Sequence, residues 1–274
     1  MAAVPGHARL SSDLIELYNS GDKADVTFVF ADGVILRAHK LILTTRAAFF
    51  KKMFTSGMKE SLTDSVNMSH TDERSFDIFL RYVYGGQLPN DLLIHKDIES
   101  LLTFADMYVV PDLTVDCLAK IKEYLSKLPS LDMCIEETTR ILATCKTTAH
   151  ARVKTTLELA LCERIDAIIP ALKPINSLDY RGFLICGSCP RYRDCRCRCR
   201  LSTKERVPEC FIERLVRLFI LSETEDYALL MEKCFACFAA IDQIDKSYFA
   251  VVAEKLEKFP HLFTEMVVRR RTES

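Results

Sequence analysis

The hydrophobic pattern of this chain changes its period near Ala38, and this change limits the folds open to it. Apolar residues recur at every second position over 26–30, which is typical of a half-buried strand. The turn sequence at 31–33 then returns the chain as a second strand over 34–36. Beyond that point apolar residues recur three and four positions apart, which predicts helices. A short hairpin followed mostly by helices excludes a doubly wound parallel sheet and indicates a small α+β domain.

Capping and turn residues predict where the elements begin and end. A first helix begins after Ser11 and ends at the Asn-Ser-Gly-Asp sequence of 19–22. Thr71 is the expected N-cap of a helix that stops at Gly85-Gly86. A short strand is expected at 65–68, and further helices at 41–43, 47–54, 97–107, 111–125, 131–145, 149–169, from 209 onward, 227–240 and 246–259.

The composition excludes several classes of protein. Lys and Arg number 37 against 38 Asp and Glu, and the resulting net charge of −1 argues against general nucleic-acid binding. Residues 1–10 lack the basic and apolar regions of a signal peptide, and no apolar run approaches the roughly 18 residues of a membrane span. We therefore expect a chain that works in the cytoplasm, the nucleus or both, where its 12 cysteines stay reduced or bind metal.

Catalytic motifs are missing from the sequence. It contains no glycine-rich phosphate loop, no HExxH and no GxSxG. Neither paired carboxylates nor a nucleophile–base set can be assembled from its residues. We expect a protein without catalytic residues and without a cofactor.

Five segments, in a fixed order, give residues 14–128 a resemblance to the BTB (POZ) domain. They occupy 25–28, 36–43, 49–54, 79–86 and 101–108. The resemblance implies a protein-interaction module that is often homodimeric. Many members bridge a protein substrate to a cullin scaffold in a ubiquitin ligase, whereas others recruit transcriptional corepressors or assemble channels.

The resemblance also implies a partner-binding segment. In cullin-binding members a hydrophobic–any–glutamate motif follows the second core helix, and Met58-Lys59-Glu60 stands at that place. Met58 would offer a flexible apolar side chain to a partner groove, and Glu60 would cap or orient the loop. The alternative is that Met58 closes the domain's own core and Glu60 is a solvated charge.

Two further groups of residues match dimer features of the family. Asp25 and Lys40 match positions that form a charged pocket near the dimer groove of dimeric members; the alternative is that they serve only local structure, where their opposite charges could pair. Leu14, Ile15 and Leu17 match apolar residues of a helix that packs across the partner, or they cover their own domain.

The sequence divides into five regions. A tail (1–13) precedes the BTB/POZ domain (14–128), which ends at Leu128-Pro129-Ser130. A helical extension (129–180), a Cys/Arg-rich loop (181–204) and a C-terminal helical region (205–274) follow, and the arginines at 269–271 are expected to be solvated. The extension resembles, by position, the helices that follow the BTB domain in ligase adaptors.

The Cys/Arg-rich loop holds an unusual group of cysteines. They are Cys186, Cys189, Cys195, Cys197 and Cys199. The first two have zinc-knuckle spacing, but the C-x-C-x-C half and the short gap differ from common zinc modules. A reduced basic loop, a zinc site and a redox site stay as alternatives, and we assign no metal ligands.

Six other cysteines fall in predicted helices as small apolar residues: Cys117, Cys134, Cys145, Cys162, Cys234 and Cys237.

The sequence thus predicts an adaptor that dimerises and links an unknown protein substrate to a cullin. The alternative is a BTB dimer that acts in transcription or as a scaffold, with no role in ubiquitin transfer. Neither function involves a membrane.

Overall fold

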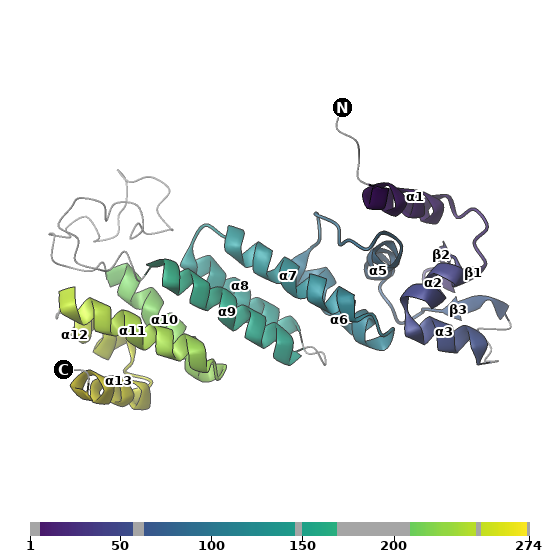
Figure 1. Cartoon of the computed structure of the whole chain (residues 1–274). Coiled ribbons are helices and arrows are strands. Elements are labelled where there is room, and N and C mark those ends of the chain that lie inside the picture. The colour runs from purple at the N-terminus through teal and green to yellow at the C-terminus, as the bar shows by residue number, and fades with distance from the viewer. Residues whose placement is uncertain (1–5, 57–62, 146–149, 169–208, 245–247, 273–274) are drawn as a thin grey trace. The chain divides into compact units, whose positions relative to one another are not determined.

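The computed structural model of the chain describes residues 6–56, 63–145, 150–168, 209–244 and 248–272 (Figure 1). The described residues form two compact units. Unit 1 holds the residues up to Ile121 together with Arg140–Val153. Unit 2 holds Lys122–Thr139 together with the residues from Lys154 onward.

Unit 1 contains a three-stranded sheet in the order β2-β1-β3. The central strand β1 (Val26–Val29) pairs antiparallel with β2 (Ile35–Ala38) and parallel with β3 (Ser65–Asn67). Gly33 in the β1–β2 turn has φ +82°, a conformation that L side chains rarely adopt. Val26 and Phe28 are buried while their neighbours in β1 are half-buried, as the two-residue period predicts.

Helices surround this sheet and close an aromatic core. They are α1 (Gly6–Ser20), α2 (Lys40–Arg46), α3 (Ala48–Thr55), α5 (Glu73–Gly85), α6 (Ile94–Met107) and the first part of α7 (Pro111–Lys127). The ring of Phe28 in the sheet lies 5.9 Å from that of Phe50 in α3 and 4.9 Å from that of Phe76 in α5. Phe50 in turn stacks on Tyr108 at 4.8 Å. The predicted α+β class, a small sheet wrapped by helices, is confirmed.

The ends of α5 follow the expected capping chemistry with one correction. The predicted N-cap, Thr71, is wrong by one residue, because the side chain of Asp72 accepts the amide of Ser75 at 2.9 Å. A carboxylate at this position also interacts favourably with the helix dipole. The predicted stop is confirmed: Gly86 is left-handed at φ 69°, and its amide donates to the carbonyl of Tyr82 at 2.7 Å.

Helix α6 begins three residues before the predicted start at Asp97. Asp97 lies inside the first turn, and its carboxylate accepts the backbone amide of Leu93 at 2.9 Å. This bond satisfies an amide just before the helix, which would otherwise lack a partner. An acidic residue that caps from within the turn is easily mistaken for the first residue of a helix.

His39, between β2 and α2, is a buried structural histidine. Its Nε2 lies 2.7 Å from the carbonyl oxygen of Asp22, which can only accept, so Nε2 carries the proton. Nδ1 lies 2.7 Å from the hydroxyl of Tyr84, and the same hydroxyl accepts the His39 backbone amide at 2.8 Å. The ring therefore joins β2 to α5 and to the turn after α1.

Unit 2 is helical. The helices are α8 (Leu131–Thr144), α9 (His150–Ile168), α10 (Glu209–Thr224), α11 (Ala228–Ile244), α12 (Tyr248–Lys255) and α13 (Pro260–Thr272), with α8 and α9 each contributing some residues to unit 1. Phe219 of α10 packs between Phe235 and Phe238 of α11, with ring centroids 4.9 and 5.6 Å away. Phe238 stacks on Tyr248 of α12 at 6.3 Å. The prediction of a helical C-terminal region is confirmed.

Polar side chains of α9 satisfy the ends of two other helices. The carboxylate of Glu158 accepts the backbone amides of Leu229 and Leu230, at 2.8 and 3.2 Å, in the first turn of α11. The guanidinium of Arg164 donates to the carbonyls of Leu125 and Leu128 at the end of α7. Each contact places a charge where it complements a helix dipole.

The C-terminal arginines are not all solvated. Arg269 donates to both carboxylate oxygens of Glu232, at 2.8 and 2.9 Å, and its guanidinium lies 4.0 Å from the ring centroid of Phe235. Both partners belong to α11, so Arg269 attaches α13 to that helix. The expectation of a solvated tail is wrong at this residue.

All six cysteines that were expected in helices are buried free thiols, at or beside the predicted helical positions. Burial raises the pKa of Cys162 to about 11 and that of Cys237 to about 12. The same cause raises the pKa of Cys117, Cys145 and Cys234. These thiols stay protonated at neutral pH and serve as small apolar side chains.

Candidate protein-interaction site

The predicted partner-binding residues Met58, Lys59 and Glu60 lie outside the described residues. The structure describes the chain up to Ser56 and again from Thr63. The other predicted site residues lie among the described residues: Leu14, Ile15, Leu17, Asp25 and Lys40.

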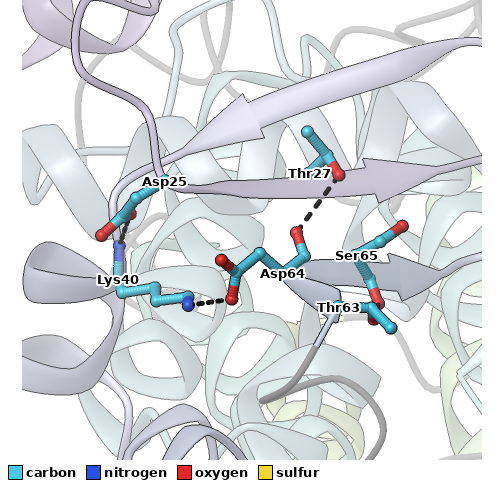
Figure 2. A network of polar contacts seen from close by, with 6 residues as sticks. All are labelled: Asp25, Thr27, Lys40, Thr63, Asp64 and Ser65. Atoms are coloured by element: carbon cyan, nitrogen blue, oxygen red, sulfur yellow. Dashed lines mark hydrogen bonds and ion pairs between the residues drawn. The ribbon is translucent and has the colours of Figure 1, made fainter.

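Asp25 and Lys40 lie together but do not form the charge pair that the sequence allowed. The Asp25 carboxylate accepts the backbone amide of Lys40 at 2.7 Å. Lys40 is the first residue of α2, and the N-cap His39 makes no side-chain capping bond. Asp25, just before β1, therefore caps α2 from another element (Figure 2).

The ammonium group of Lys40 points to other partners. Its Nζ forms an ion pair with the carboxylate of Asp64, just before β3 (Figure 2). The same nitrogen lies 5.4 Å from the ring centroid of Phe54, in the last turn of α3. Lys40 thus contacts two residues that stand on either side of the 57–62 segment.

Hydrogen bonds to the backbone of Asp64 also fix its position. Its carbonyl accepts the amide of Thr27 at 3.0 Å and the hydroxyl of Thr27 at 3.3 Å. Its φ of 53° is left-handed, which Asp tolerates better than most residues. The Asp64 side chain is 55% exposed and that of Lys40 is 25% exposed, so the ion pair itself stabilises the fold by only about 0–1 kcal/mol.

Leu10 is exposed, but the next three apolar residues of α1 are half-buried, and the helix packs on α5 of its own chain. A Cβ built on Gly85 would lie 3.0 Å from Cδ1 of Ile15, so the glycine permits the close approach. Near the end of α1, the hydroxyl of Tyr18 lies 2.6 Å from the Asp77 carboxylate. Burial, and then this bond, raise the pKa of Tyr18. Leu14 and Leu17 are half-buried on the same helix.

Metal sites and membrane-spanning helices can be assessed only among the residues that the structure describes. Among the described residues, no group of three or more His, Cys, Asp or Glu side chains could hold a metal ion. The cysteines at 186–199 lie outside these residues, so the zinc alternative stays a prediction. None of the helices in the described part of the chain is long and apolar enough to cross a membrane.

Sequence reasoning missed Phe54 and Asp64 as the partners of Lys40. Asp64 lies 24 residues from Lys40, and no periodic pattern links positions that far apart. The left-handed backbone at Asp64 is also typical of Asp and Asn in turns, but that signal is weak without the partner.

Comparison with known proteins gives the same assignment for the first part of the chain. Residues 14–125 match the family model of the BTB/POZ domain. The BTB/POZ domain-containing protein At2g30600 of Arabidopsis thaliana is 29% identical over 117 residues, which cover 42% of this chain and 14% of that protein. The mouse TD and POZ domain-containing protein 4 is 35% identical over 108 residues, covering 39% of this chain and 29% of that protein.

Two further proteins are similar to part of this chain. The human Kelch repeat and BTB domain-containing protein 8 is 25% identical over 132 residues, covering 48% of this chain and 22% of that protein. The solved BTB domain of zebrafish PATZ1 aligns with 20% identity and a TM-score of 0.35, over 45% of this chain and 98% of that domain. The chain thus spans less than a third of the length of these curated relatives. Residues 14–125 of this chain are a BTB/POZ domain, a protein-interaction fold, and a helical C-terminal region follows it.

Proposed function

We propose that this protein is an adaptor that links a protein substrate to a cullin-based ubiquitin ligase. The observation that carries the proposal is the BTB/POZ domain over 14–125, with Met58-Lys59-Glu60 directly after α3. This is where cullin-binding members of the family carry a hydrophobic residue and a glutamate two positions apart. The adaptor has no catalytic role and acts inside the cell, in the cytoplasm or nucleus.

The chemistry of the segment suits a protein interface. Methionine is flexible and polarisable, so it adapts to an apolar groove on a partner. In most interfaces a few anchoring residues supply the greater part of the binding energy. Met58 is the anchor in this proposal, and Glu60 supplies orientation and charge.

The C-terminal helices are proposed to hold the substrate. Unit 2 has its own apolar core around Phe219, Phe235 and Phe238. It also presents large apolar side chains to solvent, among them Leu159 and Leu229, 44% and 43% exposed. A helical unit with exposed apolar side chains offers surface for binding another protein.

A second candidate is a homodimeric scaffold without a role in ubiquitin transfer. The observation that favours it is a set of exposed apolar side chains in α1, β2 and α2. These are Leu10, Ile35 and Leu41, which are 61%, 53% and 75% exposed. A second copy of the chain that covered them would bury apolar surface in a symmetric interface.

Affinity capture from cells distinguishes the two functions. Tagged wild-type chain is expected to co-purify with a cullin, and the double variant Met58→Asp, Glu60→Lys is expected to lose it, because a charge would enter the apolar groove. Val268→Asp makes the same kind of change at a 55% exposed position in α13 and should retain the cullin. If the wild type captures no cullin, the adaptor proposal is wrong.

A further inference from the structure

Helix α13 is attached to unit 2 through one of its faces. Leu262, Met266 and Arg269 follow one another at intervals of four and three residues, so they lie on the same face of the helix. Leu262 and Met266 are buried. Arg269 donates to both carboxylate oxygens of Glu232 in α11, at 2.8 and 2.9 Å, and its guanidinium lies 4.0 Å from the ring centroid of Phe235. The attached face of α13 thus consists of two apolar side chains followed by one arginine.

The remaining contacts of α13 lie closer to solvent. Nε2 of His261 lies 3.1 Å from the Glu223 carboxylate of α10, and the ring of Phe263 lies 5.2 Å from that of Phe249 in α12. Apart from the two buried residues named above, the described side chains of α13 are half-buried or exposed. A helix of 13 residues is only marginally stable by itself, so α13 depends on its attached face.

The contacts of Arg269 allow α13 to separate from α11 without unfolding unit 2. The Arg269 side chain is 36% exposed and that of Glu232 is 60% exposed, so separation leaves no unpaired charge in the interior. An element with few buried side chains opens at a lower free energy than the whole domain. The opening would uncover Phe235, whose ring lies 4.9 Å from that of Phe219 in the core of unit 2.

From this geometry we infer that the surface under α13 is a docking site for an amphipathic helix of the protein substrate, and that α13 occupies this site until the substrate displaces it. The attached face of α13 defines the chemistry of the occupant. It is a helix with two apolar residues four positions apart and an arginine three positions later. Such a helix would repeat the contacts with Glu232 and Phe235. The inference rests on the proposed substrate role of unit 2 and does not depend on cullin binding.

The experiment titrates the full-length chain into a fluorescently labelled peptide with the sequence of Pro260–Thr272 and measures the Kd by fluorescence anisotropy. The chains compared are wild type, Arg269→Met and Arg217→Met. Arg269→Met weakens the attachment of the chain's own α13 and leaves Glu232 in contact with water. Arg217 of α10 is 63% exposed and lies 3.9 Å from the Asp132 carboxylate, so Arg217→Met controls for the loss of one positive charge in unit 2.

We expect the Arg269→Met chain to bind the peptide about fivefold to tenfold more tightly than the wild type, because its own α13 competes less well for the surface. Amide hydrogen exchange over 261–269 should become faster by a similar factor in that chain, while exchange in α10 stays unchanged and shows that unit 2 is folded. A peptide that itself carries Arg269→Met should bind the Arg269→Met chain about fivefold more weakly. The Arg217→Met chain should match the wild type.

Equal Kd values for the wild-type and Arg269→Met chains, or a Kd that does not depend on the arginine of the peptide, would overturn the inference. A Kd that rises with the concentration of the chain would assign the surface to α13 of a second copy and would overturn the substrate helix as its occupant. The titration contains no cullin. A chain that binds the peptide but captures no cullin would therefore contradict the adaptor proposal and still support the helix-docking surface.

Discussion

Replacing Phe76 with alanine is expected to lower the free energy of unfolding by about 3–5 kcal/mol. Phe76 in α5 is fully buried, and its ring lies 4.9 Å from that of Phe28 in the sheet and 5.6 Å from that of Phe104 in α6. Removing the ring leaves a cavity where three elements meet, and the surrounding side chains can fill it only in part. Because the chain has no tryptophan, denaturation followed by far-UV circular dichroism is the suitable measurement.

Two further variants show whether the loss comes from this cavity. Phe76→Leu keeps most of the volume and should cost roughly 1–2 kcal/mol. Phe49→Ala removes the same ring from a position that is 37% exposed, and it should cost less than half as much as Phe76→Ala. Equal losses for Phe49→Ala and Phe76→Ala would mean that Phe76 is not the centre of the core.

The protein is expected to lose stability as the pH rises above about 9, because its buried thiols resist ionisation. The pKa of Cys162 is raised from 9.0 to about 11 and that of Cys237 from 9.0 to about 12. In the unfolded chain both thiols ionise near their ordinary pKa, so the unfolded state loses protons first. The stabilisation is complete below pH 9 and is lost as the pH rises towards the folded pKa values. At about pH 10 the expected loss is about 1.4 kcal/mol for each of these thiols.

The measurement compares the free energy of unfolding at about pH 8 and about pH 10. A variant with Cys162→Ala and Cys237→Ala should lose about 3 kcal/mol less than the wild type over this interval. Its absolute stability will differ because the substitutions leave small cavities, so the comparison uses the change between the two pH values. An equal change in both proteins would contradict the assignment of raised pKa values to these thiols.

Much of the fold could be predicted because its signals are local. The two-residue period of Val26 and Phe28 and the turn at Gly33 predicted the hairpin. The sequence Gly85-Gly86 predicted the end of α5, and Gly86 adopts the left-handed conformation that glycine tolerates. The starts of helices were harder to place. Asp72 accepts the amide of Ser75, three residues later, whereas Asp97 accepts the amide of Leu93, four residues earlier, and the sequence does not distinguish these two kinds of cap. The start of each helix therefore depends on which backbone amide donates to the Asp carboxylate.

The candidate site was predicted only in part, for a physical reason. Asp25 and Lys40 were expected to be neighbours, and they are, but the bond joins a carboxylate to a backbone amide. The charge of Lys40 instead pairs with Asp64, which comes near only because β3 lies parallel to β1. Arg269 is a similar case, since its partners in α11 precede it by more than 30 residues. Long-range ionic contacts result from the tertiary fold and produce no periodic pattern in the sequence.

The most direct test of the adaptor proposal is a calorimetric titration of the purified full-length chain with purified cullin N-terminal domains. The proposal predicts saturable binding to at least one cullin, with a Kd of roughly micromolar or tighter. Met58→Asp should weaken that binding by about tenfold or more, and Val268→Asp should leave it unchanged. Absence of binding by the wild type, or equal Kd values for wild type and Met58→Asp, would contradict the proposed role.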